Sequence, residues 1–246
     1  MNDYSYEKGI AFIVEGATER VFYEEYLKKL CSERGMTITK DEKSQENKYT
    51  ICAENRSILV LINNVGSVSQ MTNSATWFHR ACVKEYSNIG WSVFLCYDTD
   101  AYNSDITKFH EGDWLRLRQS IESDAESIAD LAAQADIEDV MLCDFQGVLA
   151  FLGLDNNTPM PKGRKGKVKI KQLFRRSDPA CAYHEGERAR ALIQTLDIDL
   201  IENTAPVPLS VIRKDRGFCI DVSFGVPKLT SIDEKRTKTT LLLVVV

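Results

Sequence analysis

The chain has 246 residues and a formal net charge of −5, with 43% hydrophobic and 27% charged residues. This composition can bury a core, and the acidic balance excludes general coating of nucleic acid while permitting a local basic patch. No apolar run approaches the roughly 20 residues of a membrane span, and the start lacks a secretory signal pattern. The seven cysteines include no CxxC pair, which argues against a zinc site or a disulfide framework. We therefore expect a cytoplasmic protein.

Alternating strands and helices are predicted for the first 155 residues. The apolar runs predict strands, and the helical spacing of apolar residues predicts the segments that follow them. Thr18 is the expected N-cap of the first helix, and the polar stretch 40–48 is expected to be a loop. The expected strands are 10–14, 58–62, 91–97 and 140–143, and the later helices are 69–86, 114–135 and 145–152. This order predicts an α/β fold with a parallel sheet flanked by helices.

The character of the sequence changes after residue 155. A connection rich in Pro and Asn leads into a basic stretch, then a helix at 185–196 and strand-like runs within 209–224. We therefore predict two regions, 1–155 as the catalytic domain and 156–246 as a smaller mixed region with a basic segment, a helix and strands. The alternative is that this second region packs onto the first.

Acidic residues follow two of the predicted strands. Glu15 ends the first strand, and Asp98 and Asp100 end the third. Because functional groups gather at the carboxyl ends of parallel strands, these three side chains are expected to converge. Carboxylates that converge repel one another unless a cation lies between them, and magnesium prefers such ligands. The alternative is that Asp98 and Asp100 only form a turn, and that Glu19 only complements the helix dipole.

Two blocks of sequence resemble the Toprim domain of topoisomerases, bacterial-type primases and OLD-type nucleases. They are FIVEGATE at 12–19 and FLCYDTD at 94–100, and the EGxTE form is most similar to the OLD and RloB-like branch found in phage defence. The resemblance implies Glu15 as the catalytic glutamate, Glu19 as an auxiliary acid, and Asp98 and Asp100 with Glu15 as ligands of Mg²⁺, with Mn²⁺ as an alternative.

The resemblance is weaker further along the chain. The segment CDFQ at 143–146 is similar to a Cys-Phe-Glu segment of RloB-like proteins, but the expected glutamate is Gln146. Any role of that glutamate is therefore lost or passes to Asp144. OLD-type relatives carry an ATPase, and no Walker motif is present here, so the resemblance implies a separately encoded ATPase partner.

A basic stretch lies beyond the predicted catalytic domain. It contains no acidic residue, and two glycines within it allow the backbone to adapt to a ligand. Its predicted role is contact with the phosphate backbone of DNA or tRNA, and its alternative is a solvated loop. Its basic residues are Lys162, Arg164, Lys165, Lys167, Lys169, Lys171, Arg175 and Arg176.

The leading prediction is a magnesium-dependent Toprim-type nuclease, an effector of a two-component antiphage system. The alternative is a non-catalytic Toprim-like binding or assembly subunit, and a nucleotidyl transferase is a third reading. Tyr97 and Tyr102 flank the aspartate pair, but we expect Tyr97 to face the core rather than to act as a covalent nucleophile. A homo-oligomer is left open, and the apolar residues 241–246 are left unexplained.

Overall fold

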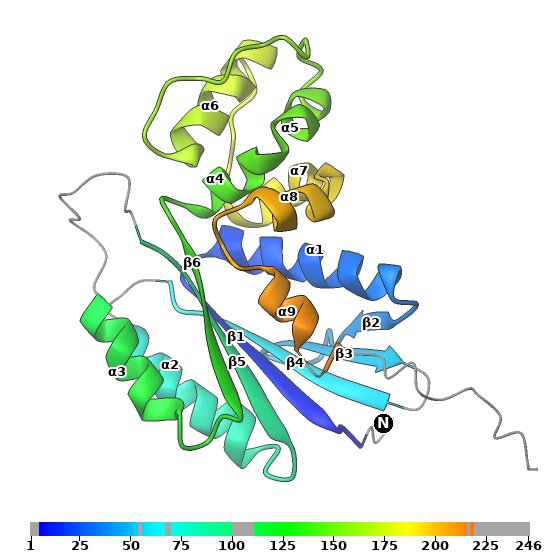
Figure 1. The fold of residues 1–246 in the computed structure, drawn as a ribbon, viewed down its shortest axis with the longest axis vertical. Coiled ribbons are helices and arrows are strands. Elements are labelled where there is room, and N and C mark those ends of the chain that lie inside the picture. Colours follow the sequence, from blue (N-terminus) through cyan, green and yellow to red (C-terminus); the bar gives the residue numbers. More distant parts are fainter. Residues whose placement is uncertain (1–4, 54–55, 67–69, 100–110, 216, 219–246) are drawn as a thin grey trace, which may run out of the picture.

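The computed structural model describes residues 5–53, 56–66, 70–99, 111–215 and 217–218. Its centre is a six-stranded sheet in the order β2-β3-β4-β1-β5-β6, in which β3 alone runs against the others. The predicted α/β class with a largely parallel sheet flanked by helices is therefore confirmed (Figure 1). The strands are β1 Lys8–Val14, β2 Thr37–Lys40, β3 Asn47–Ala53, β4 Arg56–Asn64, β5 Gly90–Asp98 and β6 Ser127–Ala133.

Two hydrophobic clusters cover the two faces of the sheet. On one face, α2 (Met71–Trp77), a π-helical stretch (Phe78–Lys84) and α3 (Glu111–Ile121) pack over the strands. The other face carries α1 (Ala17–Glu33) and α9 (Ser210–Lys214) (Figure 1). Every residue of β1 from Gly9 onward is buried, as expected for a central strand covered on both sides.

The helices of the second half gather at one end of the sheet. A lobe formed by α5 and α6 stands beyond α4, and α7 and α8 lie between this lobe and α1 (Figure 1). Their apolar residues join the same cluster as β1 and α1, so the described helices after residue 155 pack onto the first part of the chain. The bounds are α4 Ile137–Met141, α5 Phe145–Phe151, α6 Gly166–Ser177, α7 Arg190–Thr195 and α8 Ile198–Thr204.

Charged side chains join α1 to the second half of the chain. Arg190 donates to Glu24 and Glu25 of α1 and to Glu187 on its own side of the interface. Arg20 of α1 donates to Glu187 at 3.1 Å. The two glutamates of α1 are buried, so the guanidinium groups offset the cost of removing their charges from water.

Several predicted elements are wrong. The predicted helix 114–135 is α3 followed by β6, and the predicted strand 140–143 lies in α4 and the 3-10 turn Leu142–Asp144. Ala- and Leu-rich composition favours helix, but alternate residues of β6 pack on opposite faces of the sheet. The side chain of Asp136 accepts from the Asp139 amide and so begins a helix where a strand was expected.

Other departures concern turns and termini. The predicted loop 40–48 includes the end of β2 and the start of β3, and the basic stretch is largely the helix α6. The start of the predicted strand-like region 209–224 is the helix α9, and residues 219–246 lie outside the described residues. Thr18 is not the N-cap of α1, because that position belongs to Gly16.

Asp144 connects two helices, a role that the neighbouring sequence does not indicate. Its Oδ1 accepts from the Gly147 amide at 2.9 Å and caps α5, while its Oδ2 accepts from the Asp197 amide at 2.7 Å. Both carboxylate oxygens are thus engaged in joining α5 to the start of α8. Asp144 therefore holds two helices together.

We predict that Asp144→Ala lowers the free energy of unfolding by about 1–3 kcal/mol, because two backbone amides lose the buried carboxylate that accepts from them. Urea denaturation measures this change. Asp155→Ala is the matched control, because Asp155 also accepts from a backbone amide but is exposed. Equal, small losses in both variants would contradict the role given to Asp144.

Candidate functional site

The carboxyl ends of β1, β5 and β6 meet at one edge of the sheet. The Glu15 amide donates to the Cys96 carbonyl at 3.0 Å, and the Asp98 amide donates to Glu15 Oε2 at 3.2 Å. The first and third predicted strand ends are therefore adjacent, and Glu15 and Asp98 come together as the sequence predicted. Asp100 lies outside the described residues.

Glu19 belongs to the same group although it lies one turn into α1. Its carboxylate folds back over Gly16, where a Cβ would lie 2.6 Å from Glu19 Oε2. Only 7% of Glu19 is exposed. Its pKa is raised to about 8, first by burial and then by the negative charges of Glu138, Glu15 and Asp136, against the lowering effect of a backbone hydrogen bond.

Two acids of this site escaped the sequence prediction. Asp136 and Glu138 follow β6, and both are buried beside the other carboxyl groups. Asp136 accepts from the amides of Asp139 and Lys167, so it fixes the starts of both α4 and α6. The sequence prediction missed Asp136 and Glu138 because it assigned β6 to a helix. With β6 assigned as a strand, the Asp-x-Glu pair after it would have indicated acids at a third strand end.

Tyr183 completes the site from the second half of the chain. Its hydroxyl donates to Glu138 Oε1 at 2.9 Å, and both residues are buried. Nearby, the Gly186 amide donates to Thr18 Oγ1 at 3.0 Å. Gly186 adopts a φ of +68° and lies against Ala17, a conformation that favours glycine. The segment around Tyr183 thus closes over the start of α1.

The buried acids titrate above their ordinary range. Burial, followed by the charges of Glu19 and Glu15, raises the pKa of Asp98 to about 10. Burial and Asp136 raise the pKa of Glu138 to about 7, although the Tyr183 hydrogen bond opposes this. Asp98 Oδ1 is buried without a hydrogen-bond partner among the described residues. At neutral pH the group therefore retains protons or attracts a cation.

The structure gives mixed support to a metal at this site. An unpartnered carboxylate oxygen at Asp98 suits a cation, but no group of three or more His, Cys, Asp or Glu in the described ranges is arranged to hold one. The acids present thus do not form a full metal site, and Asp100 cannot be placed. Magnesium stays a prediction, with manganese as its alternative.

The basic stretch is partly neutralised within the fold. Lys167 and Lys171 pair with Glu185, and Lys169 pairs with Asp139 at 2.7 Å. The Arg176 guanidinium donates to the Pro159 carbonyl at 3.0 Å. The predicted solvated loop is wrong for this stretch, since most of it is helical.

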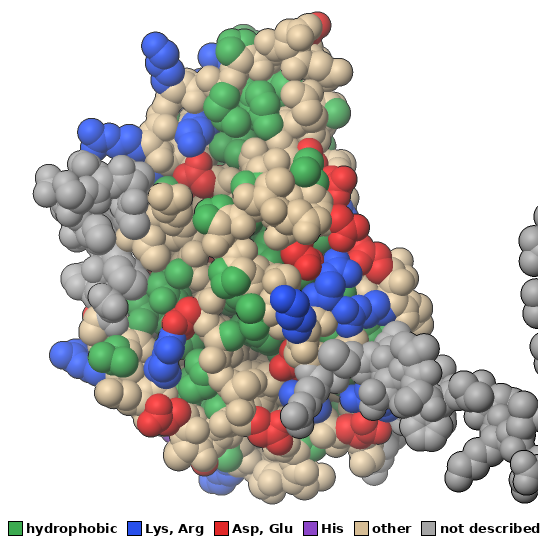
Figure 2. Space-filling model, viewed as in Figure 1, with side chains coloured by type: hydrophobic (Ala, Val, Ile, Leu, Met, Phe, Trp, Pro, Cys, Tyr) green, Lys and Arg blue, Asp and Glu red, His purple; other side chains and the backbone are tan. Residues whose placement is uncertain are grey.

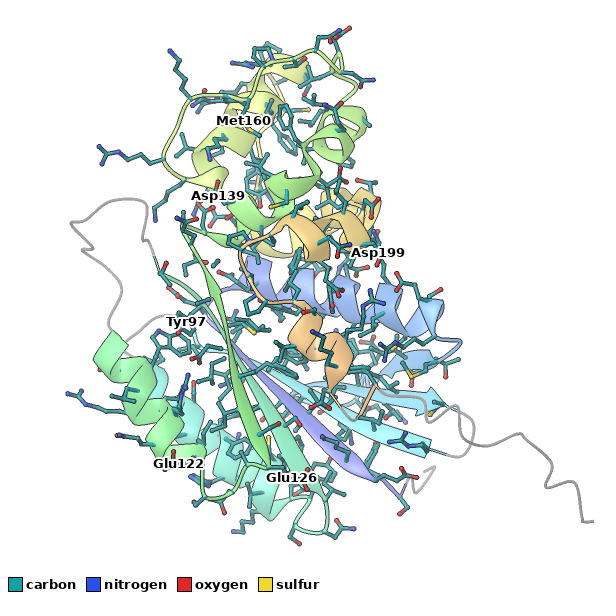
Figure 3. All side chains as sticks on the ribbon, in the orientation of Figure 1. Tyr97, Glu122, Glu126, Asp139, Met160 and Asp199 are labelled. Atoms are coloured by element: carbon teal, nitrogen blue, oxygen red, sulfur yellow. The ribbon has the colours of Figure 1, made fainter. Side chains whose placement is uncertain are left out.

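Basic and apolar side chains share the surface of the lobe formed by α5 and α6 (Figure 2). Phe151, Met160 and Val168 are exposed there, and Met160 is labelled in Figure 3. The contact of Lys162, Arg164, Lys165 and Arg175 with nucleic acid, predicted with the rest of the stretch, stays a prediction.

Tyr97 has the role expected of a core residue. Its ring stacks on Trp114 of α3 at 4.1 Å between centroids, and it is buried (Figure 3). Tyr102 lies outside the described residues, as does the terminal segment 241–246. In the part of the chain that the structure describes, no helix has the length and apolar character needed to span a membrane.

Comparison with known proteins gives no family. No family model and no curated protein matches the chain. Among solved structures it is similar to a futalosine hydrolase mutant of Helicobacter pylori, at 9% identity and a TM-score of 0.27, over 85% of this chain and 99% of that one. It is also similar to a Campylobacter jejuni 5'-methylthioadenosine/S-adenosyl homocysteine nucleosidase, at 14% identity and a TM-score of 0.24, over 80% and 93% of the two chains.

These comparisons contradict the function predicted from sequence. The matched structures are nucleoside hydrolases and not nucleases, so the predicted magnesium-dependent Toprim nuclease of an antiphage system is not retained. With TM-scores this low, nucleosidase activity does not transfer to this chain either. The predicted ATPase partner and homo-oligomer stay predictions, because the structure is of one chain.

We predict that Glu19→Gln flattens the pH dependence of stability. A carboxyl whose pKa is about 8 when folded and near 4.5 when unfolded binds more protons in the folded state, so stability falls as pH rises between these values. Without this carboxyl, the variant should lose less free energy of unfolding than wild type does between pH 4.5 and pH 8. The difference should exceed roughly 1.4 kcal/mol, which is the free energy that one pKa unit represents.

Urea denaturation at both pH values measures this difference. Glu122→Gln is the control, because Glu122 is exposed at the far end of the sheet from the cluster (Figure 3). If wild type and Glu19→Gln lose the same free energy of unfolding between the two pH values, the result contradicts a raised pKa for Glu19.

Proposed function

We propose that the chain is an enzyme that uses the carboxyl groups at this edge of the sheet for acid–base catalysis of a hydrolysis. The observation that carries the proposal is the convergence of acids from three strand ends and one helix, three of them buried and two half-buried. Such a group holds a proton on one carboxyl beside an ionised neighbour. A protonated acid next to a base is the arrangement that general acid–base catalysis requires.

The roles follow from exposure and hydrogen bonding. Glu15 is half-buried, and the Asp98 amide orients its carboxylate, so it suits a base that takes a proton from water. The pKa of Asp98 is raised to about 10, so Asp98 holds a proton at neutral pH and suits the acid that protonates a leaving group. Besides burial, the negative charges of Glu19, Glu15 and Glu138 all raise the pKa of Asp98, so the retained proton is a property of the group rather than of one residue.

Tyr183 acts in this proposal as a positioning residue. Its hydroxyl holds Glu138 from the opposite side of the cluster and thereby favours the ionised form of Glu138. Glu138 is then the negative neighbour that keeps a proton on Asp98 or Glu19. The C-terminal half of the chain contributes to the chemistry through this contact.

A Toprim-like arrangement within the α/β class belongs to the proposal at the level of fold. It is supported by Glu15 and Asp98 at adjacent ends of parallel strands. The proposal includes no nuclease activity, and no step is assigned to a metal.

We expect Glu15→Gln and Asp98→Asn to lower hydrolysis by at least about 100-fold, because positioned acids and bases each contribute roughly that much or more. The measurement is a screen of ester, glycosidic and phosphomonoester substrates with wild type, followed by rates of the variants on any substrate that is turned over. Glu122→Gln should keep the wild-type rate.

A hydrolysis rate that survives both Glu15→Gln and Asp98→Asn would remove the assignment of the site. No turnover of any substrate class would favour the alternative predicted from sequence, a binding or assembly subunit.

Addition of magnesium distinguishes a site whose carboxyl groups hold only protons from a site that binds a metal ion. If protons alone satisfy the carboxyl groups, we expect magnesium at neutral pH to leave the melting temperature of wild type and of Asp98→Asn unchanged. A stabilisation present in wild type and absent in Asp98→Asn would show instead that a cation binds the cluster.

A further inference from the structure

A hollow lies beside the carboxylate cluster. The Val65 amide donates to the Val14 carbonyl at 2.8 Å, and the Gly66 amide donates to the Glu15 carbonyl at 2.9 Å. These bonds carry the end of β4 alongside the turn that holds Glu15. The hollow opens between this end of β4 and α2, with a volume of about 380 Å³, which lies within the usual range of about 300–1,000 Å³ for small-molecule sites.

The lining of this hollow differs from the neighbouring acidic site. Four of its nine lining residues are carboxamides, and none of the nine is acidic. Carboxamides present hydrogen-bond donors and an acceptor side by side without charge. The hollow therefore suits a neutral polar group that carries donors and acceptors on one edge. The carboxamides are those of Asn63, Asn64, Gln70 and Asn73.

Contacts hold all four carboxamides in place, and among them Asn73 Nδ2 donates to Gln70 Oε1. Asn63 Nδ2 donates to Ser74 Oγ at 3.2 Å, and Ser74 is only 1% exposed. Asn64 Oδ1 accepts from the Gly66 amide at 3.0 Å. A fixed side chain loses little conformational freedom when a ligand binds, which favours affinity.

Glu46, which lies outside the hollow, holds two of the lining residues in place, Trp77 and Arg80. The indole of Trp77 donates to Glu46 Oε2 at 2.8 Å, and the guanidinium of Arg80 donates to Glu46 Oε1 at 3.1 Å. Trp77 is 7% exposed, so only its edge reaches the hollow, while the Arg80 side chain is 70% exposed at the rim. An anionic group of a ligand would meet Arg80 there.

We propose that this hollow binds an adenine nucleotide, with the base among the carboxamides and the phosphate at Arg80. The adenine edge offers an amino donor beside a ring-nitrogen acceptor, which pairs with the two functions of an Asn or Gln side chain. The inference goes beyond the proposed acid–base chemistry, because the nucleotide binds whether or not it is the molecule that is hydrolysed.

Titration calorimetry with AMP, adenosine, UMP and inorganic phosphate tests the inference on the full chain. We expect AMP to bind more tightly than adenosine by about 10- to 100-fold, the range for hydrogen bonds to a charged group. UMP should bind more weakly than AMP, and phosphate should bind more weakly still. In Arg80→Gln, AMP and adenosine should bind equally.

A filling variant provides the second test. Asn73 is exposed and lines the hollow, so Asn73→Trp should fill the hollow and abolish AMP binding without loss of melting temperature. Asn203→Trp, an exposed position on α8, is the matched control and should bind AMP as wild type does.

Three results would overturn the inference. They are the absence of AMP binding to wild type at millimolar concentration, equal affinities for AMP and inorganic phosphate or for AMP and UMP, and wild-type AMP binding by Asn73→Trp. Because none of these measurements requires turnover, loss of this site and loss of the proposed catalysis are told apart. Asp98→Asn should keep its AMP affinity even where it has lost hydrolysis.

Discussion

Parallel pairing of β1 with both β4 and β5 brings strand ends together at a place where α1 and the helices of the second half of the chain exclude water. The register sets Val14 opposite Asn64 on one side and Cys96 on the other, so the residues that follow must share a small volume. When several of them are carboxylic acids, burial makes the ionised form of each costly and mutual repulsion adds to that cost. The proposed chemistry depends on this enforced proximity.

The second half of the chain contributes to this constraint. Tyr183 places a donor on Glu138, and Asp136 joins the starts of α4 and α6. Gly166 allows this approach, because a Cβ there would lie 2.1 Å from the Asp139 amide nitrogen. The acids are therefore held between helices that come from separate parts of the sequence, and their protonation reflects tertiary packing.

Local signals were sufficient for the central strands and for part of the site. The apolar runs that end at Glu15 and Asp98 identified two strand ends, and the parallel arrangement then implied that these residues meet. The same reasoning failed at β6, where helix-favouring residues occupy a strand at the edge of the sheet. Asp136 and Glu138 were missed with it. The capping role of Asp144 depends on its contact with Asp197, which lies 53 residues away and leaves no local pattern.

The charged contact between Arg190 and α1 has a consequence for how the two halves of the chain respond to their surroundings. The strands are joined by backbone hydrogen bonds and apolar packing, which dissolved salt affects little, whereas part of the attachment of the helices relies on ion pairs. The partly exposed members of this network are screened as ionic strength rises. The buried pairs of Arg190 with Glu24 and Glu25 are screened much less. Salt therefore weakens the exposed contact of Arg20 with Glu187 across this seam, while the buried pairs keep the helices on α1, close to where Tyr183 reaches the carboxyl cluster.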